Sequence, residues 1–232
     1  MSESPSGRMP ARAKARAFVM ITLWVSCVFL AAGTLDWVWG WVYIVLYASS
    51  MSAIGMILKR HNPELIEARM RFLRTDTKPF DKVFMAIYVP LMYGQNVVCG
   101  LDAVRYGWAP LPAALAYPGV VLYVAGMALM TWSMVVNRHA ESTVRIQTDR
   151  GHTVVSTGPY RWVRHPMYVG MLTMHLGTPL VLGSAWGLAI TGLIIALLVW
   201  RTAREDRALQ GELPGYTEYA SRTRYRLVPQ VW

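Results

Sequence analysis

The residues best suited to chemistry gather in residues 144–170, just before a long apolar stretch. This segment combines glycines, prolines, histidines, tyrosines and four arginines, and packing alone does not account for that mixture. Pro166 is expected to begin a helix, with His165 held extended before it. The N-terminus of a helix carries partial positive charge and free N–H groups, so it can receive a carboxylate or a phosphate.

A second polar segment begins where the apolar stretch ends, at Arg201. Arg201 and Glu205 are four residues apart and therefore share one face of a continuous helix. If the apolar stretch folds back on itself, this face returns to the same surface as His165 and Tyr168. A cation, an anion, an imidazole and a phenol would then meet above an apolar cleft, and such a cleft is suited to a cofactor.

The elements that must position these groups are membrane-spanning helices. Four stretches are free of charge and long enough, at roughly 20 residues, to cross about 30 Å of hydrocarbon. A fifth is too long for one crossing and is interrupted near Pro179 and Gly183. We expect a helical hairpin with arms at about 167–181 and 185–200, and one long kinked helix is the alternative. The five stretches are 17–35, 38–58, 83–101, 113–136 and 167–200.

The composition agrees with a membrane protein. Of 232 residues, 54% are hydrophobic and 16% are charged, whereas soluble domains carry about 25% charged residues. This excludes a disordered chain and argues against a nucleic-acid binder, in spite of a net charge of +10. A disulfide scaffold is excluded because Cys27 and Cys99 both lie in apolar runs.

The distribution of charge predicts the orientation. Every lysine and arginine except Arg105 lies before residue 17 or in 59–82, 137–166 or 201–226, which are alternate connections. The positive-inside rule then places both termini and the site in the cytoplasm, on the cell (inner) membrane. We expect an all-α integral membrane protein with about five to six transmembrane helices, the last pair a hairpin, and a cytoplasmic C-terminal cofactor-binding segment.

The chain is expected to divide into 1–136, the N-terminal helices with connector 59–82, and 137–232, the catalytic region. The first apolar stretch pairs with the second as a transmembrane hairpin rather than acting as a cleaved signal peptide. In the connector, Asn62-Pro63-Glu64 predicts a short helix through about Arg74, lying on anionic lipid.

Four motifs of the chain resemble those of a known protein family. Thr157-Gly158-Pro159-Tyr160, the run Arg164–Gly170, Glu205-Asp206 and Gly215-Tyr216-x-x-Tyr219 resemble the isoprenylcysteine carboxyl methyltransferase family, to which phospholipid N-methyltransferases are related. The likeness covers about 137–232, and Asn62–Leu65 also resembles bacterial members. Asp206 stands where the family usually has a second glutamate.

The resemblance implies S-adenosylmethionine (SAM) as cofactor and a lipophilic, membrane-embedded methyl acceptor. It implies catalytic roles for Arg201, Glu205, His165 and Tyr168, with Arg201 on the substrate. A carboxylate acceptor needs no general base, whereas an amine or thiol does, and no residue is nominated for that. The implied cofactor contacts are Gln147, His152, Thr153, Val154, Val155, Gly158, Tyr160, His165, Pro166, Met167, Tyr168 and Glu205.

Two other functions remain open, an NADPH-dependent membrane reductase of the sterol reductase type and a non-enzymatic adaptor or transporter. We expect membrane lipids as partners, no nucleic acid and no metal site, since the histidines show no paired-ligand spacing. His175 is expected to be neutral and bonded inside the bundle, and Gln95 and Asn96 to bond between helices. The oligomeric state stays open.

Overall fold

The computed structural model describes residues 11–70 and 74–232, with the backbone alone for 11–18 and 20, and these residues confirm an all-α fold. The long helices are α1 (Ala11–Ala32), α2 (Val38–His61), α4 (Pro79–Gly100), α5 (Ala116–Val136), α6 (Pro166–Leu182) and α7 (Ala185–Glu212). Shorter ones are α3 (Pro63–Met70), α8 (Tyr216–Arg222), a π-helical turn (Leu101–Tyr106) and 3₁₀ turns at Ala113–Leu115, Thr148–Arg150 and Gly158–Arg161.

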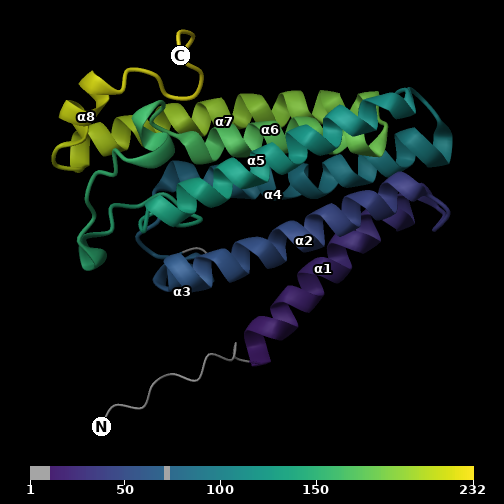
Figure 1. Ribbon diagram of the computed structural model, residues 1–232, viewed down its shortest axis with the longest axis horizontal. Coiled ribbons are helices and arrows are strands. Elements are labelled where there is room, and N and C mark those ends of the chain that lie inside the picture. Colours follow the sequence, from purple (N-terminus) through teal and green to yellow (C-terminus); the bar gives the residue numbers. More distant parts are fainter. Residues whose placement is uncertain (1–10, 71–73) are drawn as a thin grey trace.

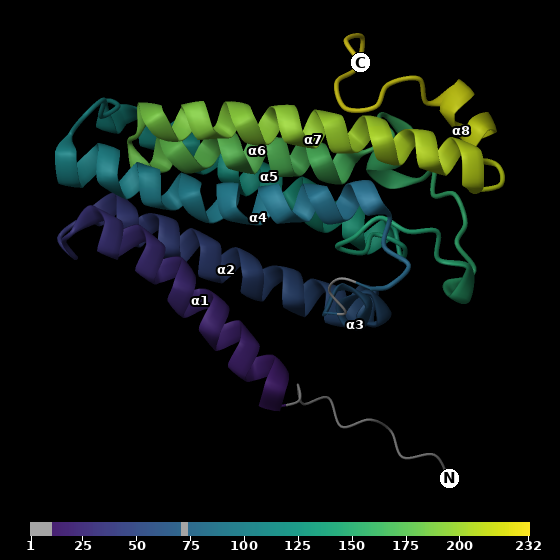
Figure 2. The same ribbon diagram turned by 180° about the vertical axis from the view of Figure 1, so that it is seen from behind.

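The long helices run along one common direction, and α1 diverges from the others (Figures 1 and 2). The connections α1–α2, α4–α5 and α6–α7 meet at one end of the bundle, and α3, the loop between α5 and α6, and α8 gather at the other (Figure 1). Four helical segments of the described chain are long and apolar enough to cross a membrane: Val38–His61, Pro79–Tyr106, Ala113–Val136 and Ala185–Glu212.

The predicted hairpin is confirmed, with its turn at Gly183 (φ +74°) between α6 and α7, so the fifth stretch is not one long helix. Pro179 stays inside α6 and does not break it. The Ser184 hydroxyl accepts the Gly187 N–H at 2.9 Å and donates to the buried Asp102 carboxylate at 2.6 Å. These bonds satisfy the start of α7 and fix the hairpin to the end of α4.

Glycines let α5 and α6 approach closely. A Cβ added at Gly126 would lie 2.5 Å from the backbone nitrogen of Met174 and 2.6 Å from the carbonyl oxygen of Gly170. A Cβ at Gly177 would lie 2.6 Å from the Gly119 carbonyl oxygen. Lipid provides no hydrophobic driving force between helices, so van der Waals packing must hold them together. Small residues at such a crossing let the two backbones approach closely enough for that packing. The crossing fixes α6, which carries the first residues of the site.

A buried polar cluster crosses the middle of the bundle. His175 Nδ1 donates to Gln95 Oε1 at 2.8 Å, its Nε2 accepts the Tyr88 hydroxyl at 2.9 Å, and Gln95 Nε2 donates to Thr191 at 2.7 Å. His175 is therefore bonded inside the bundle, as predicted. Gln95 bonds between helices, also as predicted, but the side-chain N–H bond of Asn96 goes to Met92 of its own helix.

The connector helix α3 packs against protein. Leu65 is fully buried, Asn62 Nδ2 donates to the Met134 carbonyl at 2.9 Å, and Arg69 donates to the Ala140 carbonyl at 2.6 Å. Pro63 is its first residue, as predicted. The predicted extension to Arg74 crosses residues 71–73, outside the described residues, and Arg74 itself is not helical. The buried face of α3 thus supports the loop that follows α5.

Candidate active site

A pocket lies at the end of the bundle where α6 begins and α7 ends. Its empty space is about 760 Å³, counted with the part open to solvent. Three parts of the chain form it: the loop 137–165, the first turn of α6, and the end of α7 with α8. The lining residues are Asn137, His139, Ala140, Glu141, Thr143, Val144, Arg145, Gln147, His152, Thr153, Val154, Val155, Tyr160, Arg164, His165, Met167, Tyr168, Arg201, Glu205, Leu209, Leu213, Tyr216 and Tyr219.

The first turn of α6 brings the predicted groups together. Pro166 is the first helical residue, and His165 precedes it at φ −125° and ψ 60°. The His165 ring stacks in parallel on Tyr168 with centroids 5.6 Å apart. The Tyr168 hydroxyl donates to Glu205 Oε2 on α7, while Glu205 Oε1 makes no hydrogen bond to the described part of the chain. One carboxylate oxygen is thus oriented by the phenol and the other is left for a ligand.

Asp206 is the hub behind this wall. It is fully buried, and its two oxygens accept Arg164 Nε at 2.7 Å and Nη2 at 3.0 Å, Arg226 Nε at 2.9 Å and the Tyr216 hydroxyl at 3.0 Å. Its Oδ1 also lies 3.4 Å from His165 Nε2. One carboxylate therefore joins α7, the start of α6, α8 and the C-terminal segment. The shorter side chain at this motif position is fully used in structural contacts.

Arg201 is buried and held by α4. Its Nε donates to Asp81 Oδ1 at 2.7 Å, and its Nη2 donates to the Ser142 carbonyl at 3.1 Å. The guanidinium carbon lies 4.3 Å from the ring centroid of Phe84 and 5.1 Å from that of Tyr168. The third nitrogen, Nη1, makes no hydrogen bond to the residues the structure describes. Arg201 therefore reaches the pocket with one nitrogen free.

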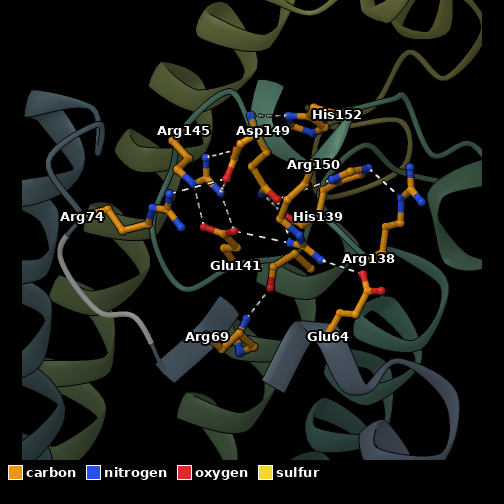
Figure 3. Close-up of polar contacts among 12 residues, drawn as sticks. Glu64, Arg69, Arg74, Arg138, His139, Glu141, Arg145, Asp149, Arg150 and His152 are labelled. Atoms are coloured by element: carbon orange, nitrogen blue, oxygen red, sulfur yellow. Dashed lines mark hydrogen bonds and ion pairs between the residues drawn. The ribbon is translucent and has the colours of Figure 1, made fainter. Parts of the chain in front are cut away.

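The loop wall is stabilised by an ion-pair network (Figure 3). Arg145, whose side chain is 1% exposed, binds Glu141 through Nε at 2.9 Å and Nη2 at 2.8 Å. Its Nη1 donates to Asp149 at 2.7 Å and to Asp76 at 3.1 Å. These contacts raise the pKa of the Arg145 guanidinium above its ordinary value, with the Glu141 hydrogen bond the largest cause. The loop is thereby closed on itself and tied to the connector before α4.

Two histidines on this loop are kept neutral. The rings of His139 and His152 lie 4.5 Å apart, and His152 Nδ1 accepts the backbone N–H of Gln147 at 3.3 Å. Burial, followed by electrostatic interactions with His139 and Arg145, lowers the pKa of His152 to about 4. Burial also lowers the pKa of His139. At neutral pH neither ring adds positive charge to the pocket.

The opposite wall is apolar and aromatic. Tyr160, Leu213, Tyr216 and Tyr219 form a buried cluster, with Val154 packed against it. The Tyr219 hydroxyl donates to the Tyr160 carbonyl at 2.6 Å, and burial raises the pKa of Tyr219 to about 12. Gly215 (φ +81°) makes the turn that starts α8, so both tyrosines of the Gly215-Tyr216-x-x-Tyr219 motif face this cluster. Such a wall suits a flat aromatic group.

The charges that line the pocket nearly all cancel. Of its five charged side chains, Arg145 pairs with Glu141, Arg164 with Asp206, and Arg201 with Asp81. Glu205 is the one lining charge without an ion-pair partner in the described part of the chain. With His139 and His152 neutral, the pocket offers the Glu205 carboxylate to its ligand. This donor set fits a small cationic cofactor with an aromatic ring and does not fit a polyanion.

Residues 119–211 match the family model of the isoprenylcysteine carboxyl methyltransferase (ICMT) family. This segment belongs to the ICMT family. It supplies α5, the loop, α6 and most of α7, and therefore most of the pocket. The predicted family is confirmed for this segment, whereas Asp81 and the α8 tyrosines lie outside it.

Similar proteins include the human protein-S-isoprenylcysteine O-methyltransferase, 33% identical over 100 residues, which are 43% of this chain and 34% of that protein. The cobalt-zinc-cadmium resistance protein CzcN of Cupriavidus metallidurans is 39% identical over 79 residues, 34% of this chain and 37% of the relative. The mouse Delta(14)-sterol reductase TM7SF2 is 37% identical over 90 residues, which are 38% of this chain and 22% of the relative. The chain spans about a third of the length of the ICMT-type relatives it matches.

Most of the predicted site residues line this pocket. Gly158 and Pro166 lie outside the lining: Gly158 faces Val136 and Trp132 of α5, and Pro166 begins α6. The predicted residues in the lining are Gln147, His152, Thr153, Val154, Val155, Tyr160, His165, Met167, Tyr168, Arg201 and Glu205.

Sequence reasoning missed Glu141 and Arg145, which line the loop wall, and Asp81, which holds Arg201. The i,i+4 spacing of Glu141 and Arg145 was a usable signal for their pairing, although this stretch is not helical. Asp81 gave no local signal, because its partners are distant in the chain.

Proposed function

We propose that the chain is an integral membrane SAM-dependent methyltransferase that acts on a lipophilic acceptor. The ICMT segment and the names of the relatives support the reaction class. The observation that carries the proposal is that Glu205, at an aromatic-walled pocket, has no ion-pair partner among the described residues. SAM has a sulfonium and an ammonium, which suit a carboxylate, and an adenine ring, which suits an aromatic wall. NADPH, the cofactor of the alternative, carries several phosphate charges, and the lining arginines are already paired.

Each wall has a separate role in this proposal. The tyrosine cluster of α8 and Tyr160 would hold the adenine, and Glu205, oriented by Tyr168, would face the cationic end. Bound SAM supplies an electrophilic methyl group. The protein contributes by orienting the acceptor and excluding water, since an in-line methyl transfer disperses charge in its transition state. Arg201 would hold an acceptor oxygen through its free Nη1.

The proposed orientation puts the pocket on the cytoplasmic side. The described parts of the basic connections, 59–70, 74–82, 137–166 and 201–226, lie at the pocket end of the bundle, where α3, the loop and α8 gather (Figure 2). We propose six crossings, by α1, α2, α4, α5, α6 and α7, with both termini in the cytoplasm of a cell (inner) membrane. A lipophilic acceptor would then enter from the bilayer beside α4 and α7, whose contacts hold Arg201.

Calorimetric titration of the purified protein distinguishes the two cofactors. SAM and S-adenosylhomocysteine should each bind saturably, and NADPH should give no saturable signal at the same concentrations. Saturable binding of NADPH without binding of S-adenosylhomocysteine would overturn the proposal and favour the reductase. Transfer of a labelled methyl group from SAM into a membrane-lipid extract then tests the reaction itself.

Glu205→Gln tests whether the Glu205 carboxylate binds the cationic cofactor. It removes the charge and keeps the shape, so the Kd for SAM should rise about tenfold or more, as for one lost charge-assisted contact. S-adenosylhomocysteine lacks the sulfonium charge, so its affinity should fall by less. Glu218→Gln is the matched control, because Glu218 is exposed on α8 and pairs with Arg222. Equal SAM affinities for both variants would refute the role of Glu205.

A further inference from the structure

Asp81 lies in the first turn of α4, outside residues 119–211, and is completely buried. It does not line the pocket. A carboxylate without solvent exposure is stable only if both oxygens are bonded, and both are. The hydrogen-bond partners of Asp81 indicate its role.

The two oxygens of Asp81 serve two different parts of the site. Oδ1 accepts Arg201 Nε at 2.7 Å, and Oδ2 accepts the backbone N–H of Val144 at 2.7 Å. Arg201 completes the connection by donating Nη2 to the Ser142 carbonyl at 3.1 Å. The carboxylate of α4, the guanidinium of α7 and the loop backbone therefore form one closed set of hydrogen bonds.

This arrangement leaves the guanidinium little freedom. Two of its nitrogens are bonded, and its plane rests against the rings of Phe84 and Tyr168. Among the contacts of the described residues, Nη1 is then the nitrogen left to meet an acceptor, and its position is set by Asp81. The backbone around Asp81 is itself paired with the loop, since the Lys78 N–H donates to the Val144 carbonyl at 3.0 Å.

We propose that Asp81 is the positioning residue for Arg201 and couples it to the loop 142–144 of the cofactor wall. The inference rests on the proposed function, in which Arg201 holds the acceptor. It adds a residue from the N-terminal helices to a site whose other parts lie almost wholly in the ICMT segment. In Asp81→Asn the amide oxygen can still accept the Val144 N–H and so keep the cofactor wall, but its NH2 group cannot accept from Arg201 Nε. Arg201 should then be misplaced, so acceptor methylation falls while cofactor affinity holds.

A second ion pair, between the residue that precedes α4 and the last residue of α7, provides the matched control. Lys78 Nζ lies 2.6 Å from Glu212 Oε1, with side chains 25% and 48% exposed, and neither residue lines the pocket. Glu212→Gln breaks this α4–α7 pair without touching Arg201. A purely structural role for ion pairs between the two helices would make both variants lose activity through loss of fold.

The experiment compares Asp81→Asn, Asp81→Glu, Arg201→Gln and Glu212→Gln in the full-length protein. The probes are S-adenosylhomocysteine by calorimetry, and labelled methyl transfer from SAM to an S-prenylated N-acetylcysteine or to whichever lipid fraction the parent labels. Asp81→Asn should lower kcat/KM for the acceptor about 10- to 100-fold, the size expected for a misplaced catalytic group. Its Kd for S-adenosylhomocysteine should stay within about threefold, Asp81→Glu should recover part of the loss, and Glu212→Gln should match the parent.

The double variant Asp81→Asn/Arg201→Gln decides the mechanism. If Asp81 acts through Arg201, the double variant should methylate no more than about twofold slower than Arg201→Gln alone. Multiplicative losses would overturn the proposal, as would equal kcat/KM for Asp81→Asn and Glu212→Gln. A parent that binds no S-adenosylhomocysteine would instead overturn the proposed function, and the positioning role with it.

Discussion

The crossing of α5 and α6 predicts the effect of one added methyl group. In Gly126→Ala the new Cβ would lie 2.5 Å from the Met174 nitrogen and 2.6 Å from the Gly170 carbonyl oxygen. Both are backbone atoms, so no side chain can rotate away. Real Cβ contacts essentially never fall below 3.0 Å and are mostly longer than 3.4 Å, so the two helices must separate by roughly 0.5–0.9 Å.

That separation has a cost and a consequence. Overpacking of this kind costs about 1–3 kcal/mol of unfolding free energy. For a chain of this length, each kcal/mol corresponds to roughly 2–4 °C, so the Tm should fall by about 2–12 °C. Because α6 begins at Pro166 and carries Met167 and Tyr168 of the pocket lining, its displacement also moves the pocket wall, and the affinity for S-adenosylhomocysteine should fall.

Thermal unfolding in detergent, with and without S-adenosylhomocysteine, measures both effects. Gly192→Ala is the matched control, since a Cβ at Gly192 meets no atom within 4 Å and alanine favours a helix. Gly192→Ala should keep or slightly raise the Tm and leave the affinity unchanged. If Gly126→Ala melts within a degree of Gly192→Ala, the close approach of α5 and α6 is not a determinant of stability and the reasoning fails.

Three further predictions concern the buried charges and histidines. Asp206→Asn leaves Arg164 and Arg226 without a counter-charge, so it should cost about 3–5 kcal/mol, and a Tm equal to that of the parent would contradict this. The pKa of His152 is lowered to about 4, so between about pH 6.5 and 4 the unfolded chain binds a proton that the folded protein does not. Stability therefore falls as the pH falls through this range, and His152→Gln should reduce that slope in denaturation curves at pH 7.5 and 5; an unchanged slope would refute the assignment. His175→Leu leaves two buried partners unsatisfied and should cost about 1–3 kcal/mol, while cofactor binding by the folded variant, measured by calorimetry, should stay unchanged if His175 is structural.

The parts of the fold that the sequence predicted are those with a local cause. The hairpin follows from the length of 167–200 and from Gly183, whose positive φ favours glycine at the turn. His165 and Pro166 predicted the start of α6, since proline disfavours helix in the residue before it. His175 was correctly interpreted because a histidine in an apolar helix must find a partner.

The parts that were missed depend on distant partners. The bonds of Asp81 to Arg201 and Val144 span 120 and 63 residues along the chain, and no periodicity encodes such a pairing. The interpretation of α3 as a lipid-surface helix did not predict that Leu65 would be buried or that Arg69 would bond to the Ala140 carbonyl. Both contacts depend on where α5 ends and the loop begins. The glycine pairs of α5 and α6 are seven residues apart within each helix, but their match across the crossing is a tertiary fact.

The chain has a net positive charge, whereas the pocket charge without an ion-pair partner among the described residues is the Glu205 carboxylate, and this difference bears on function. The chain carries a net +10, and most of its basic residues lie in connections at the pocket end. A pocket surrounded by so many arginines would be expected to bind an anion. Instead each arginine of the lining is neutralised by a buried or partly buried carboxylate, one of them from α4. In the proposed orientation, the surplus would act at the membrane surface, where anionic lipid attracts it, and the pocket would keep a carboxylate for a cationic cofactor.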